Sequence, residues 1–171
     1  VELSDTHMVT VDWGVVPDAS DAVTFAATEG ALTDSGSFET SYSYATGGIF
    51  TVTVTIDDQQ GGTATQTTTV VVGGVGVVNG TLFVIGSDGK DKVDIKLRRN
   101  DINVKGRFDQ QGAKDRFNFN FAPESINDIY IVLCGENDSA HVHQGIQANA
   151  FIDGGDGADN LKGGDGADLI I

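Results

Sequence analysis

The sequence predicts an all-β protein in two parts, a β-sandwich followed by a β-rich region that leads into a parallel β-roll. Glycine occurs 23 times and proline twice among 171 residues, a composition typical of strands joined by tight turns. Residues 49–56 alternate apolar side chains with threonine, the pattern of a strand with one buried face. Two consecutive nine-residue repeats, 154–162 and 163–171, close the chain, and tandem repeats of this length are typical of parallel β-coils.

Residues 1–72 are predicted to form the short strands of the sandwich. These strands are expected at residues 6–13, 22–27, 37–44, 48–56 and 63–72. The polar and glycine-rich residues 57–62 between the last two strands predict a turn that joins them as a hairpin. Strands at this spacing, with loops between them, are typical of a β-sandwich.

Three segments of this part carry a resemblance to a known family. They are residues 9–14 (VTVDWG), residues 42–54 (YSYATGGIFTVTV) and the turn at 57–62. Together they resemble a PKD domain, which implies an immunoglobulin-like β-sandwich. Two departures are visible: the family usually continues Trp-Gly-Asp-Gly, whereas Gly14 is followed by two valines, and only five residues precede Thr6. The sandwich is therefore expected to lack its first strand or strands, either as a fragment boundary or as an open edge that a neighbouring strand fills.

Residues 73–79 are predicted to be a Gly/Val-rich linker. Residues 80–171 are predicted to form the second β-rich part. Its strands are expected at residues 81–85, 93–97, 101–105, 116–121, 126–132 and 148–152, with a turn at 98–100.

Each closing repeat reads Gly-Gly-x-Gly-x-Asp-x-apolar-x. The glycines permit a tight turn with positive φ, and the Asp carboxylate and uncovered carbonyls are hard oxygen ligands that suit Ca²⁺. Two imperfect copies occur earlier. In residues 86–94, Ser87 replaces the second glycine, and in residues 133–141 the glycine positions hold Leu133, Cys134 and Glu136.

These repeats resemble the entry region of RTX, or haemolysin-type, calcium-binding proteins, over residues 80–171 and most strongly over 153–171. The resemblance implies that one turn of a roll holds two repeats and that Ca²⁺ lies between loops stacked on the same side. The carboxylate ligands would then be Asp159 and Asp168, with Asp138 and Asp91 as further candidates. The loops would supply carbonyl oxygens from Gly154, Gly155, Gly157, Gly163, Gly164 and Gly166. Asp156 and Asp165 occupy a variable position, where they add negative charge near the ion.

The spacing of these aspartates predicts their grouping. Asp159 and Asp168 are nine residues apart, so they are expected on opposite sides of the roll, each with a partner loop about 18 residues away. Asp138 precedes Asp159 by 21 residues, a register that an insertion at 144–149 would absorb. Asp168 has no partner after it, so the roll is expected to be open at its C-terminal end. Two incomplete ends would suit head-to-tail assembly with other copies of the chain.

The formal net charge of −15 is unevenly distributed. Residues 1–72 contain ten acidic side chains and no Lys or Arg, residues 88–116 contain six acidic and nine basic ones, and residues 117–171 contain nine acidic ones and one Lys. Such a chain is not expected to bind nucleic acid, because phosphate binding needs a basic face. We interpret the acidity of residues 1–72 as a solvated surface and that of residues 135–171 as a site for divalent cations. No apolar run reaches the roughly 20 residues of a membrane-spanning helix.

Two further features concern individual side chains. His141 and His143 are expected to share one face of a strand, either as ordinary surface residues or as ligands of a transition metal. Cys134 is expected to be a small buried residue. The chain contains no Gly-x-Ser-x-Gly, His-Glu-x-x-His or phosphate-loop motif, so no enzymatic activity is expected.

Together these patterns predict a calcium-binding structural or adhesive segment of a large bacterial protein that is secreted or displayed at the cell surface. Calcium would link acidic turns whose mutual repulsion otherwise keeps them disordered. The chain opens at Val1 without an initiator Met, so it is expected to be a piece of a longer protein. The alternative is a non-catalytic accessory segment of a secreted hydrolase.

Overall fold

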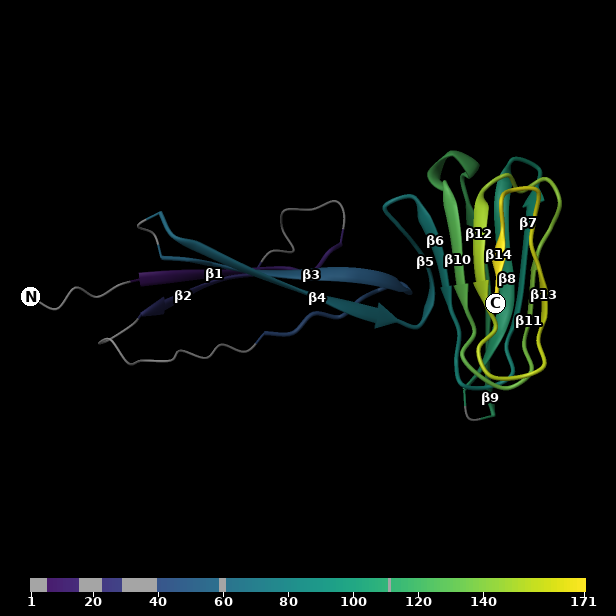
Figure 1. The fold of residues 1–171 in the computed structure, drawn as a ribbon, viewed down its shortest axis with the longest axis horizontal. Coiled ribbons are helices and arrows are strands. Elements are labelled where there is room, and N and C mark those ends of the chain that lie inside the picture. Colours follow the sequence, from purple (N-terminus) through teal and green to yellow (C-terminus); the bar gives the residue numbers. More distant parts are fainter. Residues whose placement is uncertain (1–5, 16–22, 29–39, 59–60, 111) are drawn as a thin grey trace, which may run out of the picture. The chain divides into compact units, whose positions relative to one another are not determined.

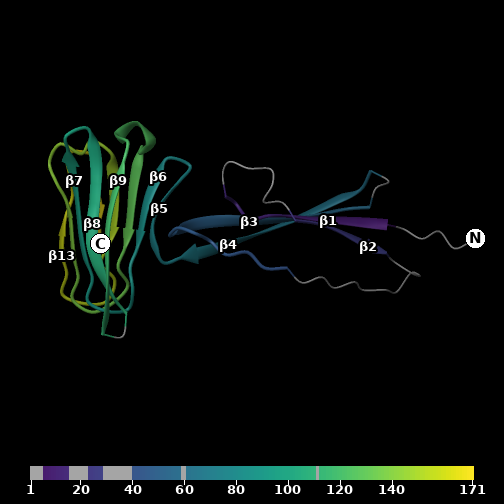
Figure 2. The ribbon, with the colours of Figure 1, turned by 180° about the vertical axis from the view of Figure 1, so that it is seen from behind.

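The computed structural model describes residues 6–15, 23–28, 40–58, 61–110 and 112–171. The predicted all-β class is confirmed: among these residues the one helical element is a single 3-10 turn, η2 (Pro123–Ser125). The chain divides into two compact units, Val1–Ala45 with Ile49–Val71 and Thr46–Gly48 with Val72–Ile171 (Figures 1 and 2).

The first unit contains a four-stranded sheet in the order β2-β1-β3-β4. Its strands are β1 (Thr6–Asp12), β2 (Val23–Thr28), β3 (Gly48–Asp57) and β4 (Thr63–Val72). β1 is antiparallel to both β2 and β3. The predicted turn after β3 is present, because the amide of Asp58 donates to the carbonyl of Gly62 at 3.0 Å. The described residues of this unit form one sheet, so the two-layer sandwich remains a prediction.

An aromatic group packs beside the small core of this unit. Trp13 lies against the buried valines of β1 and β3, and its ring stacks on Tyr42 with centroids 5.5 Å apart. The hydroxyl of Tyr44 donates to the carbonyl of Trp13 at 2.9 Å. The prediction of a strand at 37–44 is wrong for residues 40–44, which form no strand, and residues 37–39 lie outside the described part. The alternating aromatic side chains in 40–44 serve ring packing and not a β-ladder.

The second unit contains two five-stranded sheets, in the orders β14-β12-β10-β6-β5 and β13-β11-β7-β8-β9. The first comprises β5 (Gly74–Val78), β6 (Thr81–Ile85), β10 (Asp128–Val132), β12 (Asn149–Asp153) and β14 (Leu169–Ile170). The second comprises β7 (Lys92–Arg98), β8 (Asp101–Gln110), β9 (Ala113–Phe121), β11 (Ser139–Val142) and β13 (Asn160–Lys162). Neighbouring strands are parallel in two groups, β6, β10, β12 and β14 in the first sheet and β7, β11 and β13 in the second. The antiparallel pairs are β5 with β6, β7 with β8, and β8 with β9.

The parallel strands belong to successive coils that run from the first sheet to the second and back. In the first sheet Thr81 of β6 pairs with Asp128 of β10, and Asp128 pairs in turn with Asn149 of β12. Phe151 of β12 then pairs with Leu169 of β14. The first coil is the longest because it contains the β8–β9 hairpin, and each later coil is shorter than the one before it.

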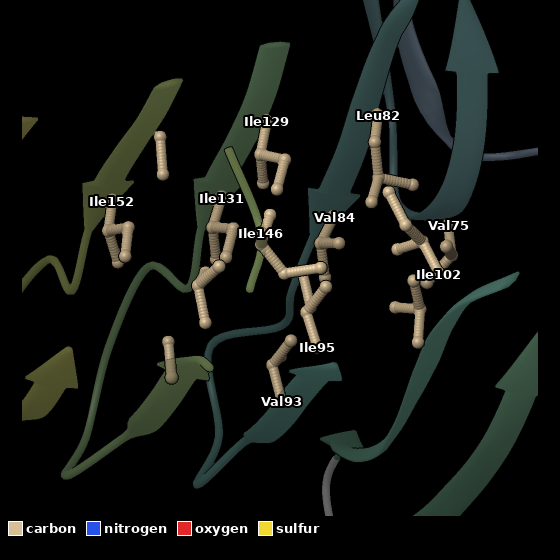
Figure 3. Packing of buried hydrophobic residues seen from close by; sticks show 14 of the residues in the cluster. Val75, Leu82, Val84, Val93, Ile95, Ile102, Ile129, Ile131, Ile146 and Ile152 are labelled. Carbon is tan, nitrogen blue, oxygen red and sulfur yellow. The ribbon is translucent and has the colours of Figure 1, made fainter. Parts of the chain in front are cut away.

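The core lies between the two sheets of this unit. Equivalent side chains of successive coils stack in register, so Val84, Ile131 and Ile152 form one buried row. Figure 3 shows this row directed toward the strand that carries Val93 and Ile95. Burial of each such aliphatic side chain contributes about 1.5–3 kcal/mol. Stacking the strands also stacks the loops that connect them.

The predicted linker at 73–79 is wrong, because Gly74–Val78 forms β5. This strand pairs antiparallel with β6, where Val75 faces Val84. Val75 is buried and belongs to the core of the second unit. Alternation of glycine with valine gives this segment one apolar face, and Val75 and Val77 on that face join the core beside the side chains of β6.

Candidate metal centre

Three loops that lead from the first sheet to the second stack on the same side of the second unit. They are residues 86–91, 133–138 and 154–159. Backbone hydrogen bonds join them: the amide of Gly86 donates to Val132 at 2.7 Å, and that of Leu133 donates to Asp153 at 3.0 Å. The three glycine-and-aspartate segments identified in the sequence therefore lie next to one another, although they are far apart along the chain.

One aspartate from each loop forms a column. The amide of Asp91 donates to Oδ1 of Asp138 at 2.8 Å, and the amide of Asp138 donates to Oδ1 of Asp159 at 2.8 Å. Asp91 and Asp138 are 1% and 3% exposed. The predicted pairing of the loops that carry Asp138 and Asp159 is confirmed by this contact. The three carboxylates are held along one line by the coil stack.

The predicted insertion at 144–149 also agrees with the register. His141 pairs with Lys162, and Phe151 pairs with Leu169, so the segment from His141 to Phe151 stacks beside the segment from Lys162 to Leu169. The earlier of these two segments is the longer one. The additional residues therefore lie in the loop between β11 and β12, and this loop takes up the difference in length between the two coils.

Asp138 carries the unusual electrostatics of the column. Burial raises its pKa to about 6, and the carboxylates of Asp91, Asp159 and Glu136 add to this increase, against the lowering effect of the hydrogen bond from the Asp91 amide. Its Oδ2 atom is buried and makes no hydrogen bond within the described part of the chain. A buried carboxylate oxygen without a partner is costly for the folded protein. The position therefore favours either a proton or a cation.

The loop backbone explains the glycines of the repeat. Gly155 has a φ of 78°, and a Cβ on Gly155 or Gly157 would overlap the carbonyl oxygen of Cys134 or Glu136 in the loop below. Cys134 and Glu136 stand at the equivalent positions of the imperfect repeat and adopt φ values of 76° and 69°. Cys134 thus keeps the left-handed backbone of Gly155, whereas Glu136 differs from Gly157, which has a φ of 152°. The left-handed conformation costs each of these two non-glycine residues about 1–2 kcal/mol.

Cys134 is exposed, so the prediction of a buried residue is wrong. Its glycine-like backbone directs the side chain away from the core. Partial desolvation and then the carboxylates of Asp88 and Asp91 raise the pKa of its thiol. Since the thiolate is the reactive form, this environment disfavours a nucleophilic role.

Asp168 belongs to the opposite side of the unit, as its spacing predicts. Its Oδ1 accepts a hydrogen bond from the amide of Ala150 at 2.9 Å, and a Cβ on Gly163 would overlap its carboxylate. Ala150 occupies the place that an aspartate holds in the other column. Gly164 and Gly166 lie against the preceding loop. The structure therefore does not bring Asp168 together with the other three aspartates.

The two aspartates at the variable position differ in their contacts. Asp165 accepts a hydrogen bond from the amide of Gly145 at 2.9 Å through Oδ2. Asp156 is exposed, and its amide donates to the carbonyl of Cys134 at 2.9 Å. Gly154 lies against the carboxylate of Asp159 in the same way that Gly163 lies against the carboxylate of Asp168.

A second group of possible ligands lies on the outer face of the second sheet. Nε2 of His143 is 2.8 Å from Oδ2 of Asp94, and the rings of His141 and His143 stack with centroids 3.8 Å apart. Lys96 binds the other oxygen, Oδ1, of Asp94 at 2.9 Å. Burial alone would raise the pKa of Asp94, but the hydrogen bonds from Lys96 and His143 outweigh it and lower the pKa to about 2. Burial lowers the pKa of His141, and His143 and Lys162 add to this effect.

No family model, curated protein or solved structure matches the chain. The resemblances to PKD domains and to RTX proteins therefore rest on the residues that carry them. No helix in the described ranges combines the length and the hydropathy that crossing a membrane requires.

The structure adds polar side-chain contacts in the loops on both sides of the unit that the repeat pattern did not predict. Ser87 donates to Asp91 from its amide at 2.7 Å and from its hydroxyl at 2.8 Å. Asn137 accepts a hydrogen bond from the amide of Ala158 at 2.8 Å. An asparagine also precedes Ala150 on the opposite side, where Asn149 accepts from Ala167 at 3.0 Å. Asn137 directly precedes Asp138, but Lys90 and Ala158 stand at the same position before Asp91 and Asp159. The sequence therefore offers no shared signal that would have found these residues.

A groove gives solvent access to the first loop of the column. It has a volume of about 800 Å³, and the carboxylates of Asp88, Asp109 and Glu136 line part of it. The carboxylates of Asp91, Asp138 and Asp159 lie at the centre of the column, and carboxylate oxygens are ligands that Ca²⁺ prefers. The residues present thus fit a hard divalent cation better than a transition metal.

Proposed function

We propose that the second unit is a β-roll that binds Ca²⁺ along the column of Asp91, Asp138 and Asp159. In this proposal the chain acts as a structural or adhesive segment of a secreted or cell-surface protein. The parallel ladders on both faces and the short final coil support the β-roll interpretation. The same proposal takes the first unit as a PKD-like sandwich.

The single observation that carries the calcium proposal is the buried Oδ2 atom of Asp138. It has no partner in the described residues, yet Asp91 and Asp159 add like charge from both neighbouring coils. A carboxylate in this setting is destabilised when it is ionised. A bound cation would bind its free oxygen and offset the repulsion between the carboxylates. Proton binding would also relieve it, but only below about pH 6.

Calcium would act on the stability of the stack as a whole. The loops carry ligands from different coils, so an ion bound between them joins segments that are distant in sequence. When the free concentration of an ion is 100 times its dissociation constant for the folded state, binding stabilises that state by about 2.7 kcal/mol. Export into a medium with more Ca²⁺ would then favour folding, which suits the predicted extracellular location.

The proposal is tested by titrating Ca²⁺ into EDTA-treated protein by calorimetry, with circular dichroism on the same samples. We expect binding, and a rise in the thermal midpoint, that Asp159→Asn strongly reduces. Asp101→Asn is the matched control, because it removes the same charge from an exposed position at the β7–β8 turn. Absence of binding at millimolar Ca²⁺, or equal effects of the two substitutions, would contradict the proposal.

The assembly predicted from the sequence is measured on the same samples by sedimentation. A mass above that of one chain in Ca²⁺, and a single-chain mass in EDTA, would support calcium-dependent association. A single-chain mass at high concentration in Ca²⁺ would exclude head-to-tail assembly of this segment and leave the calcium proposal intact.

A further inference from the structure

The group formed by Asp94, His141 and His143 lies away from the aspartate column, on the face of the second sheet that points out of the core. Ala140 and Val142 of β11 are fully buried, so the alternating His141 and His143 project to the opposite face. Asp94 stands on the neighbouring strand β7 and is the register partner of His141. Strand β11 lies between β7 and β13 in this sheet.

The distances suit one shared ion. One ligand atom from each of the three side chains lies within 4.8 Å of the other two, and the closest pair, His143 Nε2 and Asp94 Oδ2, is 2.8 Å apart. Ligands on a tetrahedral zinc ion with bonds of about 2.0–2.1 Å are about 3.3 Å apart. All three side chains are partly exposed, so small rotations can bring the ligand atoms to that spacing.

The charges around the group divide between the two oxygens of Asp94. Lys96 binds Oδ1 at 2.9 Å and Lys105 is 3.9 Å from the same oxygen, which leaves Oδ2 on the side of the imidazoles. Lys162 faces His141 from β13 as its register partner and lines the same hollow. It is the cation that an incoming metal ion would meet, and its long side chain is exposed and able to move away.

We propose that Asp94, His141 and His143 form a second metal site, specific for a divalent transition metal such as Zn²⁺. Two imidazole nitrogens and one carboxylate oxygen are ligands that Zn²⁺, Cu²⁺, Ni²⁺ and Co²⁺ bind and that Ca²⁺ does not prefer. Three protein ligands leave a coordination position open to water on this exposed face. The ion would tie β7 to β11 and so join the first two coils on the outside of the sheet, independently of the aspartate column.

The test uses the full 171-residue chain in millimolar Ca²⁺, so that the oxygen-only sites are occupied before Zn²⁺ is added. We expect calorimetry to give one Zn²⁺ per chain. Removing a ligand, as in His141→Ala or His143→Ala, is expected to weaken binding by more than about tenfold. His7→Ala is the matched control, because His7 is the only other histidine of the chain, and it should leave Zn²⁺ affinity unchanged.

A second probe separates loss of the site from loss of folding. Co²⁺ is added to the same variants, whose circular dichroism is recorded first, and its visible absorption is measured. Bands from nitrogen-ligated Co²⁺ should appear in the unmodified chain and in His7→Ala and should be absent from a folded His143→Ala. Failure of the unmodified chain to bind Zn²⁺ at about 100 µM, the weak end of specific binding, would overturn the proposal. Binding that survives both histidine substitutions would overturn it as well. Neither result bears on calcium binding.

Discussion

Replacing Asp138 by Asn should stabilise the protein without calcium and weaken it with calcium. The pKa of Asp138 is about 6 in the folded protein, against an ordinary value of 3.8, because of burial and the carboxylates around it. Each tenfold change in proton affinity is worth about 1.4 kcal/mol, so ionising this group costs the folded state about 3 kcal/mol. Asn keeps an oxygen for the amide of Asp91 but buries an unpaired Nδ2 group, which costs about 1 kcal/mol. The expected net gain in EDTA at neutral pH is about 2 kcal/mol.

The pH dependence gives this prediction its sign. The folded-state pKa of Asp138 lies above the unfolded one, so its stabilising contribution is complete below about pH 4 and is lost as the pH rises through about 6. By the same figures, Asp138→Asn should be less stable than the unmodified chain by up to about 1 kcal/mol at pH 4, become the more stable protein between pH 4 and 6, and keep a constant advantage well above pH 6. Calcium should reverse the order at pH 7.5, because the variant loses a ligand.

The assay is urea unfolding of the second unit in EDTA, followed by circular dichroism at several pH values and repeated in Ca²⁺. Fluorescence of Trp13, the only tryptophan, reports on the first unit in the same samples. Asp101→Asn is again the control and should show no such pH profile. If Asp138→Asn proved less stable than the unmodified chain in EDTA at pH 7.5, the argument from the unpaired carboxylate would be refuted.

Two further substitutions test the loop backbone. Gly155→Ala should lower the free energy of unfolding by well over about 2 kcal/mol, because the new Cβ would meet the carbonyl of Cys134 in the neighbouring loop at a positive φ. Gly145→Ala, at a φ of 92° with open space around it, should cost only about 1 kcal/mol. Equal losses in thermal or urea unfolding would show that loop stacking is not the cause. Glu136→Gly should stabilise the ion-free protein by about 0.5–1 kcal/mol by relieving the left-handed conformation at φ 69°. Glu136→Gln removes the same charge without changing the backbone, and an equal gain from it would assign the effect to charge alone.

Sequence reasoning located the loops of the aspartate column because their pattern is local. A single repeat is specified by adjacent residues, and the near-regular spacing of the repeats paired Asp138 with Asp159. The position of Asp91 in the same column was harder to predict, because the β8–β9 hairpin lengthens the first coil well beyond the others. A repeat pattern contains no information about how much chain an insertion adds between two stacked strands.

The same hairpin hid the third member of the histidine group, because the sequence paired His141 with His143 but did not indicate Asp94. Asp94 and His141 are register partners across the long coil, and nothing in the sequence around either residue indicates the other. The error at residues 73–79 has a different origin. Glycine favours linkers in general, but Val75 has a place in the core, and tertiary packing outweighs local flexibility. Cys134 and Glu136 are a second case in which packing outweighs local preference, because the stacked loops hold both in a left-handed backbone that non-glycine residues disfavour.

The antiparallel strands give the coil stack a direction. β5 flanks one end of the first sheet, and the β8–β9 hairpin flanks the second sheet at the side of β7. These antiparallel partners are close in sequence to the strands they cover, so the first coil can acquire both neighbours before any later coil is made. Each following coil then has a finished surface on which to add. A defect near β6 or β7 would therefore unsettle every later coil, whereas one near β13 or β14 would remain local.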